Sequence, residues 1–283
     1  MSGFHRSFEL KYLNMEELSI ARILKATPVS EFRYYDSIGS TNDEAQKWAD
    51  AGAPDFALVI ADEQTKGRGR FSRQWVTKPG SSLALSLIWH PSQKETRRLA
   101  LFAPLCGLAL RDTIHSKLGL NAEIKWPNDV LISSKKTAGI LVESAWSGEK
   151  VSNVILGIGI NFSHQSLPPA NSQLFRATCL EDELGRPIDR LDFLSAFLNS
   201  MSSWRTGLGS EFFFTEWQKN LAFKGQWVRI EDSQKTSIIG TIKGIDTDGN
   251  LVLILENGSE QDFAAGDVHL RPLDTATPEV DNA

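Results

Sequence analysis

The chain has 283 residues, of which 41% are hydrophobic and 23% charged, a composition typical of globular proteins. Its net charge of −5 disfavours a nucleic-acid binder, because such proteins are more often basic. The two cysteines form no CxxC motif, and no run of about 18 apolar residues indicates a membrane span. The N-terminus also lacks a secretory signal, so we predict a cytoplasmic protein with no membrane or nucleic-acid partner.

The first three quarters of the chain alternate helical patterns with apolar strands. Helices are predicted at 15–25, 40–51, 95–118, 174–185, 189–205 and 210–221. Strands are predicted at 32–36, 57–63, 82–89, 122–126, 130–132, 138–146 and 152–161. The later strands follow one another through short turns, which favours antiparallel or mixed pairing over a doubly wound parallel sheet. Thr41 and Glu44 have the spacing of a capping box at the second helix.

From Gly225 onward the pattern changes to short strands. They are predicted at 226–231, 237–246, 251–255 and 260–263, with 266–270 as a candidate fifth. Asp248-Gly249-Asn250 and Asn257-Gly258 between them are typical of hairpin turns. Such a run of strands predicts a small β-barrel. The chain therefore divides into a lead at 1–30, a main domain at 31–222, the barrel at 223–273 and a disordered tail at 274–283.

Four short segments concentrate polar, charged or glycine residues. They are Ser40-Thr41-Asn42; Gln64 and Gly67-Arg68-Gly69-Arg70 with Arg73 and Trp75; Lys125-Trp126-Pro127-Asn128-Asp129 with Lys136 and Gly139; and Gly157-Ile158-Gly159-Ile160-Asn161. Each also has a plain interpretation. In the same order, these are a helix N-cap, a basic surface loop, a strand-ending turn and glycines packed against a helix.

The second segment has the residues that an anion requires. Two glycines let the backbone approach a ligand, and arginine forks suit a phosphate. It is not a dinucleotide-binding fingerprint, because Ser72 replaces the third glycine and a strand-like segment follows. The chain has no Walker A or GxSxG motif, and its five histidines have no metal-ligand spacing, so no protein metal site is predicted.

Together, the order and spacing of the four segments closely resemble those of the biotin–protein ligases. The resemblance runs from about residue 32 to 273, and Gly266-Asp267-Val268-His269-Leu270-Arg271 at the end of the barrel agrees with it. It implies an α+β fold related to class II aminoacyl-tRNA synthetases, with a mixed or antiparallel central β-sheet, helices packed on one face, and a C-terminal SH3-like β-barrel. The lead has no room for the N-terminal DNA-binding domain of the family's repressors, so we expect the short, ligase-only form.

The resemblance implies a two-step reaction. Biotin and ATP, with Mg²⁺ on the nucleotide, give biotinyl-5′-AMP and pyrophosphate. The biotinyl group then passes to a lysine of the biotin carboxyl carrier protein of acetyl-CoA carboxylase or of a related biotin-dependent carboxylase. The alternatives are a lipoate–protein ligase, a biotin-sensing DNA-binding repressor, which is disfavoured, and a non-catalytic biotin-binding module. Both a monomer and a homodimer through the central sheet remain open.

The same resemblance assigns the site residues. Arg70, Lys136 and Asp129 are implied to be catalytic, Asp129 as the group that takes or orients the proton of the acceptor lysine, although a structural turn cap is its alternative. The implied biotin contacts are Ser40, Thr41, Asn42, Gln64, Gly67, Arg68, Gly69, Arg70, Trp126, Lys136, Gly139, Gly157 and Gly159. The implied nucleotide contacts are Arg68, Arg70, Arg73, Trp75, Asn128, Lys136, Asn161 and Arg271. We expect loop 66–74 to be mobile without ligand and ordered with it.

Overall fold

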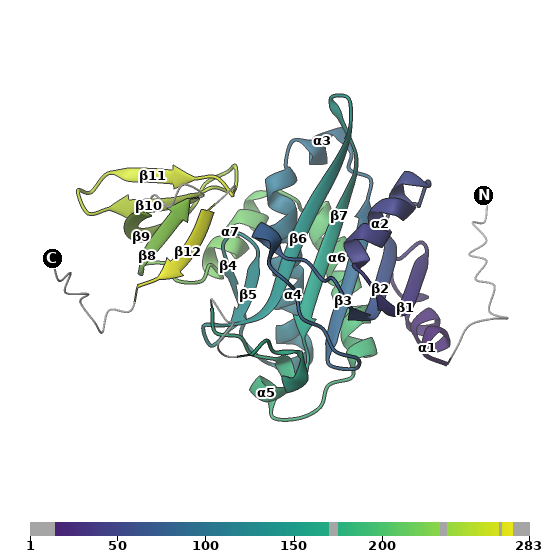
Figure 1. Cartoon of the computed structure of the whole chain (residues 1–283). Coiled ribbons are helices and arrows are strands. Elements are labelled where there is room, and N and C mark those ends of the chain that lie inside the picture. The colour runs from purple at the N-terminus through teal and green to yellow at the C-terminus, as the bar shows by residue number, and fades with distance from the viewer. Residues whose placement is uncertain (1–14, 170–174, 233–236, 266–267, 274–283) are drawn as a thin grey trace.

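The computed structural model describes residues 15–169, 175–232, 237–265 and 268–273 (Figure 1). Within these ranges no helix is long and apolar enough to cross a membrane. The predicted tail at 274–283 and most of the lead lie outside the described residues.

A seven-stranded mixed sheet forms the centre of the larger part of the molecule. In sequence order its strands are β1 Phe32–Ile38, β2 Ala57–Gln64, β3 Ser82–Trp89, β4 Glu123–Lys125, β5 Asp129–Ile132, β6 Lys135–Ser147 and β7 Lys150–Asn161. Their spatial order is β1-β2-β3-β7-β6-β5-β4. Only β1 and β2 pair in parallel, and the other neighbours are antiparallel. The predicted mixed sheet is therefore confirmed, and its pairing follows from the short turns between the later strands.

Helices cover both faces of this sheet. Within the described residues the helices are α1 Met15–Leu24, α2 Thr41–Asp50, α3 Gln93–Thr96, α4 Phe102–Leu118, α5 Leu180–Leu184, α6 Arg190–Thr206 and α7 Glu211–Lys219. The main core joins α4 and α6 to the face that carries Leu85 and Leu87. Ala45 and Trp48 of α2 pack with Ile88 on the opposite face. The expectation that helices pack on one face holds for α4 and α6, but α2 departs from it (Figure 1).

Two local predictions in the first half of the chain are wrong. The helix predicted at 95–118 is divided, because a 3₁₀ turn at Leu99–Leu101 separates α3 from α4. Pro104 lies in the first turn of α4, where its missing N–H costs no hydrogen bond, so the helix can begin just before it. Thr41 and Glu44 form no capping box, because the helix has Ser40 as its N-cap and Thr41 as its first residue. Their side chains have tertiary partners instead: Thr41 binds Gln64 and Glu44 binds Arg33.

The helix predicted at 174–185 is also shorter than expected, since α5 begins at Leu180. Residues 176–178 instead pair with the start of β6. The Lys136 backbone donates to the Arg176 carbonyl and accepts from the Thr178 N–H, both at 2.8 Å. This segment therefore fixes the backbone of Lys136.

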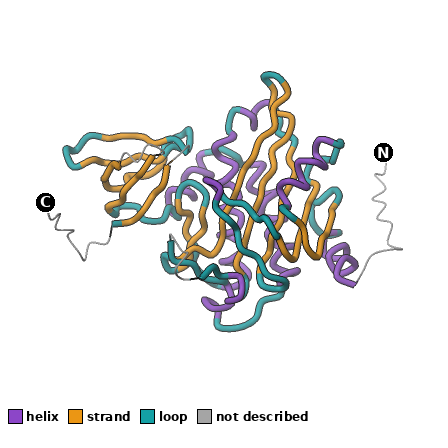
Figure 2. Tube along the Cα trace, in the orientation of Figure 1, coloured by secondary structure: helices purple, strands orange, loops and turns teal. Residues whose placement is uncertain are grey.

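A second, five-stranded antiparallel sheet forms the C-terminal part and confirms the predicted SH3-like architecture. Its strands are β8 Trp227–Asp232, β9 Ser237–Ile245, β10 Leu251–Leu255, β11 Glu260–Phe263 and β12 Val268–Pro272, in the order β11-β10-β9-β8-β12. Figure 2 shows strands and loops throughout this part and helices only around the larger sheet. Gln218 of α7 donates to the Ile245 carbonyl at 2.6 Å and ties the two parts together. The exact domain borders remain predictions.

Candidate active site

The α2 face of the central sheet has a floor of small residues. Gly139, Gly159 and Ala84 lie opposite one another on β6, β7 and β3, and Gly157 lies opposite Ser86. Directly paired residues of antiparallel strands project to the same face, so these positions line one surface. A cleft of about 410 Å³ lies over it. The close approach expected at the glycines is present: a Cβ on Gly157 would lie 2.1 Å from Asn42, and one on Gly159 would lie 2.3 Å from Trp75.

One end of the cleft is lined by neutral polar groups, which the Ser86 hydroxyl and the Glu143 carboxylate support from behind the lining residues. The Thr41 backbone N–H and hydroxyl both donate to Gln64 Oε1, at 2.8 and 3.0 Å. The Ser86 hydroxyl donates to Asn42 Oδ1 at 2.6 Å, and Asn42 Nδ2 donates to Glu143 Oε2 at 2.7 Å. Hydroxyl and amide groups both donate and accept, so this end suits a ligand that does the same.

The Gly67–Trp75 loop closes as a hairpin beside this network. Trp75 N–H donates to the Gly67 carbonyl at 2.9 Å, and Gly69 N–H donates to the Arg73 carbonyl at 2.7 Å. A Cβ on Gly67 would lie 2.5 Å from the Trp75 carbonyl oxygen, so glycine is required for this closure. The ring of Trp75 rests on the glycine floor, and its Nε1 is buried without a hydrogen-bond partner among the described residues.

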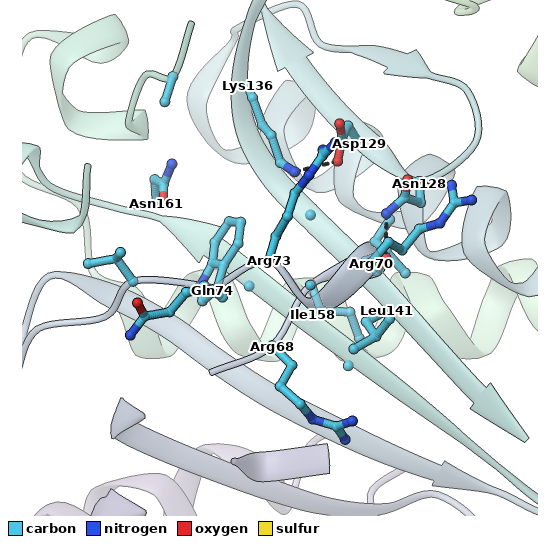
Figure 3. Close-up of a pocket in the computed structure, with 18 of the residues that line it drawn as sticks. Arg68, Arg70, Arg73, Gln74, Asn128, Asp129, Lys136, Leu141, Ile158 and Asn161 are labelled. Carbon is cyan, nitrogen blue, oxygen red and sulfur yellow. Dashed lines mark hydrogen bonds and ion pairs between the residues drawn. The ribbon is translucent and has the colours of Figure 1, made fainter. Parts of the chain in front are cut away.

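The two arginines of this loop point in different directions. Arg68 binds two carboxylates on the polar side of the cleft, Asp43 at 2.6 Å and Glu143 at 3.0 Å. Arg70 donates to Asn128 Oδ1 at 3.3 Å. Figure 3 shows Arg68 directed away from Arg70. The two guanidinium groups therefore do not converge on one point in this structure.

The other end of the cleft contains a buried charge cluster. Asp129, only 9% exposed, lies 2.5 Å from Lys136 Nζ through Oδ1 and 3.4 Å from Lys125 Nζ through Oδ2 (Figure 3). Burial alone would raise the pKa of the Asp129 carboxyl, but the two ammonium groups outweigh burial and hold that pKa below its ordinary value. Burial lowers the pKa of Lys125, and Lys136 acts in the same direction.

The C-terminal sheet also contributes to this end. Arg271 of β12 lines the cleft together with Arg73, and burial followed by the charge of Arg271 lowers the pKa of Arg73. Asn161 donates to the Thr178 carbonyl at 3.1 Å. Among the described residues that line the cleft, Asp129 is the only carboxylate, against six cationic side chains: Arg68, Arg70, Arg73, Lys125, Lys136 and Arg271. The cleft therefore favours an anionic ligand.

Comparison with known proteins agrees with this geometry. Residues 34–161 match the Biotin/lipoate A/B protein ligase family, and residues 224–271 match the Biotin protein ligase C terminal domain. The biotin–[acetyl-CoA-carboxylase] ligase of Paracoccus denitrificans is 35% identical over 222 residues, which cover 76% of this chain and 90% of that protein. The chain belongs to the biotin protein ligase family.

Two further relatives of the family show the extent of the similarity. The bifunctional ligase/repressor BirA of Bacillus subtilis is 34% identical over 237 residues, which cover 82% of this chain and 72% of that protein. The structure of the Aquifex aeolicus biotin protein ligase in complex with biotin and ATP superposes with a TM-score of 0.74 at 26% identity. The match covers 86% of this chain and 99% of that one.

Two residues predicted to contact biotin lie outside the cleft of this family member. Trp126 is 1% exposed in the main core, and its indole Nε1 donates to the Gly249 carbonyl of the C-terminal part at 3.1 Å. Gly67 shapes the hairpin but does not line the cleft. In this structure Trp126 joins the two parts of the molecule and Gly67 permits the turn, and their biotin contacts stay predictions.

The other predicted site residues line the cleft: Ser40, Thr41, Asn42, Gln64, Arg68, Gly69, Arg70, Arg73, Trp75, Asn128, Asp129, Lys136, Gly139, Gly157, Gly159, Asn161 and Arg271. The sequence-based assignment missed Ser86, Glu143 and Lys125. Ser86 is a polar residue inside an apolar strand, and Lys125 begins the Lys-Trp-Pro-Asn-Asp segment, so the sequence indicated a functional role for both. No feature of the sequence indicated such a role for Glu143.

Proposed function

We propose that this protein is an ATP-dependent biotin–protein ligase that forms biotinyl-5′-AMP and transfers the biotinyl group to a lysine of a biotin carboxyl carrier protein. The observation that carries the proposal is the layout of the cleft. A polar end matches a ureido ring, and a cationic end matches phosphate. The glycine floor between them lets Asn42 and the Trp75 ring lie directly against the sheet beneath the cleft.

In the first step, a carboxylate oxygen of biotin attacks the α-phosphorus of ATP, and the bond to the pyrophosphate breaks with its electron pair. The two reactants are both anions, so positive charge must offset their repulsion. We assign this task to Arg70 and Lys136, with Arg73 and Arg271 on the nucleotide side. Removing one such group typically costs about 10²–10³-fold in rate. Mg²⁺ would enter as part of the nucleotide, since the single carboxylate of the described cleft is already held by two lysines.

In the second step, the acceptor amine attacks the acyl carbon, and the bond from that carbon to the phosphate oxygen breaks to release AMP. A lysine ammonium, with a pKa of about 10.4, must first lose a proton. We assign Asp129 as the group that orients this ammonium and takes its first proton, and the attacking nitrogen loses its second proton to solvent.

The remaining assignments rest on the resemblance alone. Ser40, Thr41 and Gln64 would contact the ureido edge of biotin, and Trp75 would lie beside the adenine. The carrier protein, a homodimer and a cytoplasmic location stay predictions.

The decisive experiment is biotin-dependent exchange of pyrophosphate into ATP, followed by transfer of biotin to a carrier domain. We expect Lys136→Ala to reduce exchange by about 10²–10³-fold, because it removes a cation from the cleft. Lys135→Ala is the matched control, because Lys135 pairs with Glu183 and does not line the cleft. A folded wild-type protein without exchange would contradict the function, and exchange with lipoate in place of biotin would favour the lipoate alternative.

A further inference from the structure

Asp129 is held by two ammonium groups although one would balance its charge. The carboxylate has Lys136 on Oδ1 and Lys125 on Oδ2. Arg73 also lies close enough to Asp129 for their charges to interact. Burial and then the like charge of Arg271 lower the pKa of Arg73. The chain therefore buries a second lysine beside an ion pair that is already neutral. Burying an ammonium group is costly, so this arrangement requires an explanation.

The two lysines differ in their freedom to move. The Lys136 side chain is 27% exposed, and its Nζ lies 5.6 Å from the centre of the Trp75 ring, so it faces the cleft. The Lys125 side chain is 10% exposed, with its Nζ 4.9 Å from the centre of the Phe175 ring. Lys125 is also the direct cross-strand partner of Asp129 in the β4–β5 pair. Lys136 can therefore turn toward a phosphate, whereas Lys125 is fixed beside Asp129.

This difference matters once an anion enters the cleft. If Lys136 turns to the phosphate, the carboxylate loses its shortest contact. A buried carboxylate with fewer neighbouring cations takes up a proton more readily, because burial disfavours the charged form. A protonated Asp129 would neither attract an ammonium group nor accept its proton.

We propose that Lys125 is a positioning residue for the transfer step, which keeps Asp129 ionised and in place after Lys136 has turned to the phosphate. The vacated position on Oδ1, which accommodates the Lys136 ammonium in this structure, can then accept the ammonium of the acceptor lysine. One ε-ammonium replaces another, so the site already has the required size and charge. The inference rests on the proposed ligase function and adds a residue outside its assigned catalytic set.

The test separates the two half-reactions in Lys125→Met, a variant with a neutral side chain of similar length. We expect transfer to lose more than pyrophosphate exchange does, because Lys125 lines the cleft but its nearest charged partner is Asp129. Transfer from preformed biotinyl-5′-AMP to a carrier domain should be slower at neutral pH. The acid limb of its pH profile should move upward by about 1–3 pH units, the usual effect of losing a neighbouring opposite charge. Lys125→Arg should return that limb toward its wild-type position.

The outcomes distinguish this role from a structural one. Equal losses in both half-reactions with an unmoved acid limb would overturn the proposal, and so would a Lys125→Met profile identical to wild type.

A second measurement needs no variant: ¹³C NMR of the Asp129 carboxyl in wild-type enzyme bound to a non-hydrolysable biotinyl-adenylate analogue. We expect an ionised carboxylate at neutral pH, and a protonated one would refute the inference. Absence of exchange in the wild type would instead refute the ligase function.

Discussion

Replacing Gly159 by alanine should slow pyrophosphate exchange while leaving the fold intact. Gly159 lies on β7 under the Trp75 ring, and its backbone is not left-handed, so an alanine fits the strand. The added Cβ would lie 2.3 Å from Trp75 Cε2. Because the strand is paired on both sides, with β3 and β6, the backbone cannot retreat easily. The indole must therefore move.

The required movement sets the size of the effect. Carbon atoms pack best at about 3.5–4.0 Å, so the ring edge has to withdraw by about 1.2–1.7 Å. A misplacement of about 1 Å in an active site can cost about 10²-fold in rate, equal to about 2.7 kcal/mol. Overpacking costs about 1–3 kcal/mol of stability, and each kcal/mol lowers Tm by roughly 2–4 °C in a protein near this size. The variant should remain folded at assay temperature.

The assay is pyrophosphate exchange at varied ATP, with circular dichroism to establish folding. Gly207→Ala is the matched control, because Gly207 has φ −98 and its added Cβ would have its nearest contact at 3.6 Å. If Gly159→Ala acts through Trp75, it should add little further loss in a Trp75→Ala background. Strictly additive losses, or a folded Gly159→Ala protein with normal exchange, would refute the reasoning.

Two further predictions follow from side chains whose positions the sequence did not indicate. Trp126→Phe removes the indole donor to Gly249, so it should lower the free energy of unfolding by about 0.5–1.5 kcal/mol in urea titrations. The KM for biotin should stay unchanged, and a raised KM would indicate that Trp126 contacts biotin. Glu143→Gln removes the negative charge that Arg68 and Asn42 share, so calorimetry should show biotin bound about fivefold more weakly, a loss of about 1 kcal/mol, and an unchanged Kd would argue against this network.

The strands of both sheets could be predicted because their signals are local. Alternating apolar residues bounded by turn residues gave every strand of the central sheet, and the short turns indicated the pairing. Helix starts were less predictable. Thr41 and Glu44 have the right spacing for a capping box, but the N-cap is Ser40, and Arg33 of β1 lies 2.8 Å from the Glu44 carboxylate. A distant partner of opposite charge competes with a local cap, and spacing alone does not reveal it.

The candidate site was predictable in membership but not in orientation. Arg68 and Arg70 are chemically identical and two residues apart, so the sequence favoured one shared phosphate. The fold brings Asp43 and Glu143 to Arg68 and the Asn128 amide to Arg70. Glu143 lies on β6, far away in the sequence, and follows no motif. Where a long side chain points depends on such distant partners.

Trp126 shows that neighbouring residues of one short segment can have different surroundings. Asp129 lines the cleft, whereas Trp126 points to the other side and holds the Gly249 turn. That turn belongs to the five-stranded sheet, whose β12 carries Arg271 into the cleft. One short segment therefore fixes the carboxylate directly and contributes to the position of Arg271 through the indole hydrogen bond. A tryptophan at this place has a physical reason that does not involve biotin: the indole N–H supplies the hydrogen bond, and the ring supplies the buried apolar contact.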